Sequence, residues 1–193
     1  MKFHCRKSLN LAIFILLLIL IVITQSGWLA SPARTVNQSQ PGFYSISHFI
    51  DGDTIAVNMN GQIETIRMIG VDTPETHRPN TPVQCFGPEA ASYTKSLIGD
   101  NRVRLQADPL DTNRDRYGRL LRYVYLPDGT MVEDKLISQG YGFAYLDFPF
   151  SQKARFASEQ SAAQVKRAGL WGKCKPIVND YGGWTSNPAY QTN

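Results

Sequence analysis

Charged and hydroxyl side chains gather at the end of an apolar run between Arg67 and Thr76, which reads Arg-Met-Ile-Gly-Val-Asp-Thr-Pro-Glu-Thr. A strand that only packs into a core would carry apolar residues up to its turn. An arginine on an apolar strand is unfavourable unless an anion meets it, so Arg67 must have a negative partner. That partner is either a phosphate group or, as a structural ion pair, Asp72 or Glu75. The composition is therefore that of a site that binds an anion.

Two aspartates from separate segments are candidate metal ligands. Asp53 lies in an Asp-Gly-Asp turn and Asp72 follows the apolar run, so a hairpin would bring the two carboxylates together. Oxygen ligands without histidine or cysteine suit calcium, which takes about six to eight oxygens and would complete its shell with water, phosphate and a backbone carbonyl. The alternative is that both aspartates only cap turns. We favour calcium because of the charged residues that surround them.

Arginines and a glutamate near these aspartates fit the cleavage of a phosphodiester bond. That reaction needs a positioned water and groups that neutralise the charge developing on the phosphorus oxygens. Arg67 and Arg119 carry planar guanidinium groups that can bind two phosphate oxygens at once. Glu75 lies beyond a proline in a loop that could aim it at a water, and a glutamate with an ordinary pKa of about 4.3 is ionised at neutral pH and can act as a base. Taken alone, Glu75 would be an ordinary solvated acid.

Two tyrosines are candidates for contact with a nucleotide. Tyr117 lies within a run of arginines and Tyr145 lies in a late aromatic segment. Aromatic rings on small β-barrels stack on bases, and their hydroxyl groups can reach a phosphate. The alternative is that both rings only pack at the rim of a barrel.

The hydrophobic pattern predicts which elements position these residues. Asn60-Gly61 between two strand-like runs is a strong hairpin signal, and Pro74 must leave the sheet because proline cannot donate a ladder hydrogen bond. Five strands with a helix between the third and fourth predict a mainly β member of the α+β class, a five-stranded Greek-key barrel of the OB type. The predicted strands are residues 43–50, 54–58, 62–71, 103–107 and 119–126, and the predicted helices are 87–98, 131–139 and 151–169.

The N-terminal segment has the pattern of an export signal. Residues 1–8 carry three cations and no acid, and residues 11–23 are an unbroken apolar run. We predict cleavage after Ala33, with a retained membrane anchor as the alternative. A linker at residues 34–42, one domain at 43–174 and a disordered tail at 175–193 complete the predicted organisation.

Net charge says little about partners once the signal is set aside. The formal charge of +4 includes the three cations of the signal, which leaves 17 Lys and Arg against 16 Asp and Glu. Binding to a polyanion must therefore come from local clusters of arginine. Such clusters are usually solvated faces unless other features support binding.

Cysteine usage agrees with export. Cys5 lies in the basic part of the signal, which leaves Cys85 and Cys174 in the exported part. An even pair in an oxidising compartment favours a disulfide, and two thiols without a nearby histidine make a poor zinc site. A bridge that closes so long a loop is worth about 4 to 5 kcal/mol on the chain-entropy model. We predict a disulfide between Cys85 and Cys174.

Several short motifs, taken together, resemble the staphylococcal nuclease (thermonuclease) family between about Ser45 and Trp171. The resemblance implies that the Thr73 carbonyl completes the calcium ligands, that Glu75 is the general base, and that Arg67 and Arg119 stabilise the transition state. It also implies cleavage at the bond to the 5′ oxygen, which leaves 3′-phosphates. We expect an exported, monomeric enzyme that acts on DNA and RNA with little sequence preference. The motifs are Asp51-Gly52-Asp53-Thr54, Arg67, Asp72-Thr73-Pro74-Glu75-Thr76, Gly87-Pro88-Glu89-Ala90 and Asp115-Arg116-Tyr117-Gly118-Arg119.

Two segments depart from that family. The loop at residues 76–84 matches poorly, and the segment after Tyr145 has Asp147 and Phe148 where the family has a second tyrosine. Two other functional classes remain open: a catalytically inactive OB module that binds nucleic acid or protein, and an envelope-anchored interaction protein. The complete set of Arg67, Glu75 and Arg119 argues against the inactive module, and the second class requires that the N-terminal segment is retained.

Overall fold

The computed structural model describes Ile15 and residues 42–77, 82–180 and 182–188. The chain divides into two units, residues 1–36 and 37–193. Ile15, which is helical, is the one described residue of the first unit. The predicted export signal and its cleavage point therefore lie outside the described residues. Among the residues that are described, no helix is long and apolar enough to cross a membrane.

A five-stranded sheet forms the body of the second unit, in the order β1-β2-β3-β6-β5. Strands β1, β2 and β3 form an antiparallel meander, β6 runs parallel to β3, and β5 is antiparallel to β6. Asn60 and Gly61 both have positive φ at the β2–β3 turn, as predicted for a tight hairpin. The strands are β1 (Ser45–Asp51), β2 (Thr54–Met59), β3 (Gln62–Met68), β5 (Arg104–Gln106) and β6 (Leu120–Tyr125).

Two hydrogen bonds connect the outer edges of this sheet. The backbone N–H groups of Tyr44 and Val103 each donate to the other residue's carbonyl over 2.8 Å. These residues precede β1 and β5, so the sheet curls on itself. The predicted mainly β, five-stranded OB-type barrel is confirmed.

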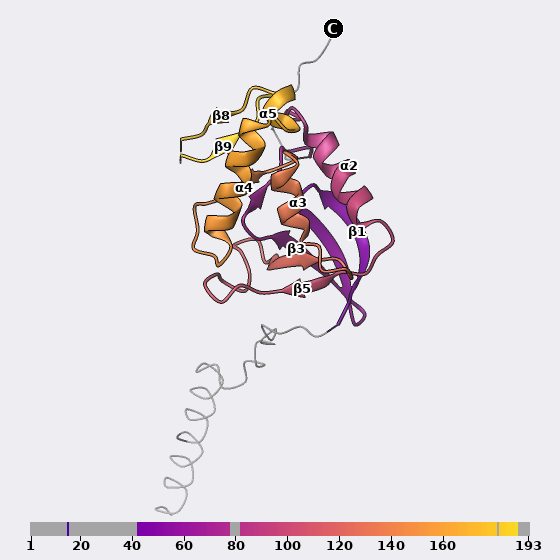
Figure 1. The fold of residues 1–193 in the computed structure, drawn as a ribbon. Coiled ribbons are helices and arrows are strands. Elements are labelled where there is room, and N and C mark those ends of the chain that lie inside the picture. Colours follow the sequence, from indigo (N-terminus) through magenta and orange to yellow (C-terminus); the bar gives the residue numbers. More distant parts are fainter. Residues whose placement is uncertain (1–14, 16–41, 78–81, 181, 189–193) are drawn as a thin grey trace, which may run out of the picture. The chain divides into compact units, whose positions relative to one another are not determined.

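The three predicted helices are present and cover the barrel, and α3 lies between α2 and α4 (Figure 1). Phe156 and Ala163 of α4 are buried, and so is the polar Gln160. The apolar Val165, in contrast, is exposed. The Gln160 side chain accepts a hydrogen bond from the Ala144 N–H, so a polar residue of α4 binds the backbone of the neighbouring segment. The helices are α2 (Gly87–Ile98), α3 (Val132–Ser138), α4 (Lys153–Val165) and the short α5 (Leu170–Lys173).

Two small sheets complete the fold. The strands β4 (Val71–Asp72) and β7 (Phe143–Ala144) pair antiparallel and set Asp72 opposite Phe143. The strands β8 (Ile177–Val178) and β9 (Trp184–Thr185) form a hairpin beyond Cys174. The segment predicted to be a disordered tail therefore contains two short paired strands, at residues 177–178 and 184–185. The hairpin is held by contacts with distant residues, which local periodicity does not record.

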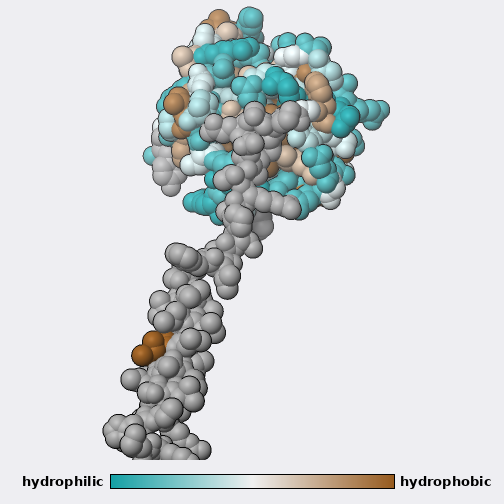
Figure 2. Space-filling model, turned by 90° about the horizontal axis from the view of Figure 1, so that it is seen from below, coloured by the Kyte–Doolittle hydropathy of each residue, from teal (hydrophilic) through white to brown (hydrophobic). Residues whose placement is uncertain are grey.

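The predicted disulfide between Cys85 and Cys174 is present, with the two Cα atoms 6.0 Å apart. It joins the segment before α2 to the end of α5, across 89 positions of sequence. One face of the molecule is shown in Figure 2, where the coloured residues are mainly hydrophilic and the apolar ones lie in small separate spots. Scattered apolar residues of this kind are ordinary for a protein surface.

Candidate active site

The β2–β3 hairpin brings the predicted arginine and aspartates together. Thr54 is opposite Arg67 in the register of β2 and β3, so Asp53 lies just beyond the end of the ladder. The Arg67 Nη2 atom is 2.8 Å from Asp72 Oδ1 and 3.3 Å from Asp53 Oδ2. The expectation that Arg67 needs an anionic partner is confirmed, and it has two.

A second guanidinium nitrogen of Arg67 binds backbone carbonyls of the turn between β3 and β4. Nη1 donates to the carbonyl of Val71 over 2.6 Å and to that of Met68 over 3.1 Å. Burial lowers the pKa of Arg67, but the carboxylates of Asp53, Asp72 and Glu75 more than offset this, and its pKa lies above the ordinary value. The guanidinium therefore stays positively charged, and Glu75 is near enough to stabilise that charge.

Hydrogen bonds fix the carboxylate of Asp53. Its Oδ2 accepts from the backbone N–H of Thr73 over 2.9 Å, and its Oδ1 accepts from the hydroxyl of Thr54 over 2.8 Å. Gly52 permits this arrangement, because a Cβ atom there would lie 2.7 Å from Thr73 Oγ1. The Asp-Gly-Asp turn is thus shaped for close approach to the segment that carries Asp72 and Thr73.

The oxygen atoms around Arg67 fit a hard divalent cation. Asp53 and Asp72 contact the same guanidinium nitrogen, so their carboxylates lie close together. The Thr73 Oγ1 atom beside them is buried and has no hydrogen-bond partner among the residues that the structure describes. No set of three or more His, Cys, Asp or Glu side chains within the described ranges is placed to hold a metal. Calcium would therefore be held by two carboxylates and complete its shell with backbone, water and substrate oxygens.

The loop that carries Glu75 is held by two side chains from other segments. Gln84 accepts a hydrogen bond from the Glu75 N–H through Oε1, over 2.8 Å, and donates its own N–H to the Glu75 carbonyl over 2.9 Å. Asp51 accepts from the hydroxyl of Thr76 over 3.0 Å. No sequence signal pointed to Gln84, which lies in the loop that matches the family poorly.

Arg119 lies directly before β6 and is held by Asp115. The Arg119 Nε atom donates to Asp115 Oδ2 over 2.6 Å, and the N–H groups of Tyr117 and Arg119 donate to Oδ1 over 2.9 and 3.0 Å. Burial raises the pKa of Asp115, but these hydrogen bonds outweigh burial and the pKa is lowered. Arg119 directly precedes β6, and β6 pairs in parallel with β3, the strand that contains Arg67. Arg119 therefore lies on the strand segment next to Arg67.

The titration of Asp115 gives a pH-dependent prediction. Its lowered native pKa contributes stability that is fully present above the ordinary aspartate value of about 3.9, and this stability is lost as the pH falls through the lower native value. We expect urea unfolding of Asp115→Asn to show a deficit against the wild type that is constant from about pH 5 to 7 and shrinks as the pH falls below the ordinary aspartate pKa of about 3.9. Asp100→Asn, at an exposed position before β5, is the control. A deficit that persists unchanged at the lowest pH would contradict the assignment.

The two tyrosines differ in their surroundings. Tyr117 is 69% exposed, and its ring centroid is 4.9 Å from the guanidinium carbon of Arg116 and 5.4 Å from that of Arg119. Tyr145 is half-buried; burial, with Asp147 and Asp72 adding to it, raises its pKa, so the phenol stays protonated at neutral pH. Tyr117 thus offers an open ring beside two cations, whereas Tyr145 offers a hydroxyl donor near Asp72.

Comparison with known proteins agrees with this arrangement. Residues 65–173 match the family model described as staphylococcal nuclease homologue. The chain is 41% identical to the thermonuclease of Staphylococcus intermedius over 165 residues, which cover 84% of this chain and 94% of that protein. It is 37% identical to the thermonuclease of Staphylococcus hyicus, covering 86% and 98% of the two chains, and 36% identical to the endonuclease YncB of Bacillus subtilis, covering 78% and 71%.

The chain belongs to the staphylococcal nuclease family. In this family member the matched range begins at Thr65, so it includes Arg67, Asp72 and Arg119 but not Asp53. The β2–β3 hairpin is what carries Asp53 to the other site residues. The C-terminal hairpin β8–β9 also lies beyond the matched range.

Proposed function

We propose that this protein is a calcium-dependent nuclease that hydrolyses phosphodiester bonds in DNA and RNA and leaves 3′-phosphates. The observation that carries the proposal is the Arg67 guanidinium placed between Asp53 and Asp72, with Glu75 close enough to raise its pKa. A fixed cation next to candidate cation ligands and a carboxylate base is what attack on a phosphodiester needs. Relatives named thermonuclease and endonuclease support the same activity.

In the proposed reaction each side chain has a separate task. Arg67 and Arg119 bind the phosphate oxygens and neutralise the charge that develops in the transition state. Glu75 takes a proton from the attacking water, whose oxygen bonds to phosphorus while the bond to the 5′ oxygen breaks and that oxygen takes a proton from solvent. Calcium, when bound by Asp53, Asp72 and the Thr73 carbonyl, would supply further positive charge at the phosphate.

Little sequence preference is expected from such a site. The proposed contacts are to phosphate oxygens, which are the same in every nucleotide. Tyr117 would add stacking on a base and Tyr145 a hydroxyl contact, and stacking tolerates any base. Both DNA and RNA are therefore proposed as substrates.

We further propose that the protein is exported and acts as a monomer. The basic and then apolar N-terminal pattern supports export, and a disulfide is typical of an oxidising compartment. Cleavage after Ala33 would release the domain. Contact with a membrane is expected only if the segment at residues 1–33 is retained.

The test is incubation of the exported protein with plasmid DNA and with RNA, in calcium and in chelator. We expect both substrates to be degraded in calcium and neither in chelator, and the products to accept 3′ extension only after phosphatase treatment. Full activity in chelator would refute the calcium assignment. Binding to both nucleic acids without any cleavage would instead favour the inactive OB module.

A further inference from the structure

The C-terminal hairpin and the disulfide form a strap across the segment that carries Glu75. We propose that this strap, defined as residues 174–180 and 182–188 with the Cys85–Cys174 bridge, holds Glu75 in place through Gln84 and so sets the turnover rate. This makes Gln84 a positioning residue. The inference deepens the proposed function and rests on it.

The first route from the strap to the site runs through the segment before α2. Gln84 holds the backbone of Glu75 in both directions, as described above. Its side-chain Nε2 also donates to Thr185 Oγ1 of β9 over 3.3 Å, and Gln84 forms a β-bridge with Pro188. A single side chain thus connects the backbone of the proposed base to the hairpin.

The neighbouring residue, Cys85, is held on both sides of its peptide group. Its N–H donates to the Asn187 carbonyl over 2.7 Å, and its carbonyl accepts from the Ser186 hydroxyl over 2.8 Å. Ser186 is buried, so its hydrogen bond to the Cys85 carbonyl is partly shielded from competing water. Together with the disulfide, they fix the strap to the segment that contains Gln84.

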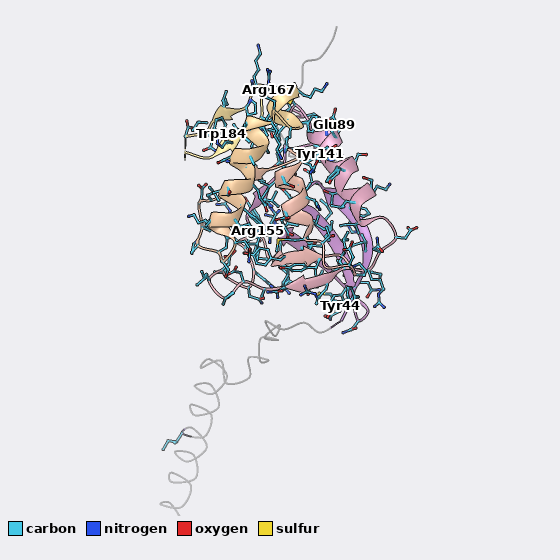
Figure 3. All side chains as sticks on the ribbon, viewed as in Figure 1. Tyr44, Glu89, Tyr141, Arg155, Arg167 and Trp184 are labelled. Carbon is cyan, nitrogen blue, oxygen red and sulfur yellow. A yellow bond between two sulfur atoms is a disulfide. The ribbon has the colours of Figure 1, made fainter. Side chains whose placement is uncertain are left out.

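A second route connects the strap to Asp72 through aromatic rings. Trp184 of β9, labelled in Figure 3, packs edge-on against Trp171 of α5, with ring centroids 5.1 Å apart. Trp171 packs edge-on against Phe143, with centroids 5.3 Å apart. Phe143 is the strand partner of Asp72. The strap therefore supports both the base and a candidate metal ligand.

The Glu75 segment needs this support because it has left the sheet after Pro74. On one side it is backed by Gly87, where a Cβ atom would lie 2.9 Å from the Glu75 carbonyl oxygen. Gln84 binds it through the two hydrogen bonds described above, and Asp51 binds the neighbouring Thr76. A displacement of about 1 Å at a catalytic group can lower a rate by about a hundredfold. Loss of the strap should therefore lower kcat.

The test compares Gln84→Met, Gln84→Glu and a chain that ends at Lys175 and keeps the disulfide. For Gln84→Met, which keeps the length and the backbone hydrogen bond to Glu75 but loses the two side-chain hydrogen bonds, we expect kcat at about pH 8 to fall about tenfold and KM to change less than about twofold. Truncation should act in the same direction. Gln84→Glu keeps an acceptor for the Glu75 N–H and should restore kcat to within about threefold of wild type. Gln106→Met, an exposed glutamine on β5, is the matched control.

The Gln84→Met change in a protein that already lacks the Glu75 carboxylate separates an effect on the position of Glu75 from general structural damage. If Gln84 acts through Glu75, adding Gln84→Met to Glu75→Gln should change the residual rate by less than about twofold. A further tenfold loss in that background would overturn the inference. Should the truncated chain fail to fold by circular dichroism, Gln84→Met decides the question.

The two proposals fail in distinguishable ways. Turnover of Glu75→Gln equal to wild type would overturn the proposed role of Glu75 and, with it, the positioning of a base. An inactive Glu75→Gln combined with full kcat in both Gln84→Met and the truncated chain would overturn only the role of the strap.

Discussion

Glu75→Gln is expected to lower kcat by about a thousandfold, in line with the contribution of a positioned general base. A glutamine amide at this position cannot take the proton of the attacking water. The hydrogen bonds between Glu75 and Gln84 use the backbone of Glu75 and not the Glu75 side chain. The segment should therefore keep its position. Because the carboxylate is the group removed, KM for a single-stranded oligonucleotide should change far less than kcat.

Steady-state kinetics on a labelled oligonucleotide measure this effect, and thermal unfolding shows whether the fold is kept. Glu89→Gln is a suitable control, because Glu89 is an exposed acid in the first turn of α2. It should leave kcat unchanged and lower stability only by the small helix-dipole contribution, about 0.3 to 1 kcal/mol. A Glu75→Gln protein with undiminished kcat would remove Glu75 from the mechanism.

Arg67→Met is expected to separate calcium binding from turnover. Loss of a guanidinium that stabilises charge in the transition state should lower kcat by at least about a hundredfold. In contrast, affinity for calcium should rise, because Asp53 and Asp72 would no longer share their charge with the Arg67 Nη2 atom. Two neighbouring carboxylates without that cation attract a divalent ion more strongly.

Calorimetric titration with calcium in the absence of nucleic acid measures the second effect. Asp72→Asn should change affinity in the opposite direction, because it removes a candidate ligand. Arg102→Met, at an exposed position before β5, should change neither affinity nor kcat. Weaker calcium binding by Arg67→Met would contradict the assignment of Asp53 and Asp72 as ligands. Raised affinity should also appear as a larger increase in Tm on adding calcium than the wild type shows.

Much of the site could be predicted because its signals are local. Arg67 on an apolar strand demanded an anion, and the structure supplies Asp53 and Asp72. Asn60-Gly61 fixed the hairpin that joins the two segments. The disulfide followed from there being only two cysteines outside the predicted signal, which left one possible pairing. In each case a residue type carries an energetic requirement that few arrangements satisfy.

Contacts between distant segments could not be read in the same way. The sequence by itself determined the barrel and the need of Arg67 for an anion, since strand periodicity, turn chemistry and buried charge are properties of neighbouring residues. The proposed role of Glu75 came from the family resemblance. Only the tertiary structure decided that β8 and β9 form a hairpin and that Gln84 holds Glu75. Gln84 is an ordinary loop glutamine until the hairpin is brought back to it, because a hydrogen bond between residues a hundred positions apart leaves no pattern in either segment.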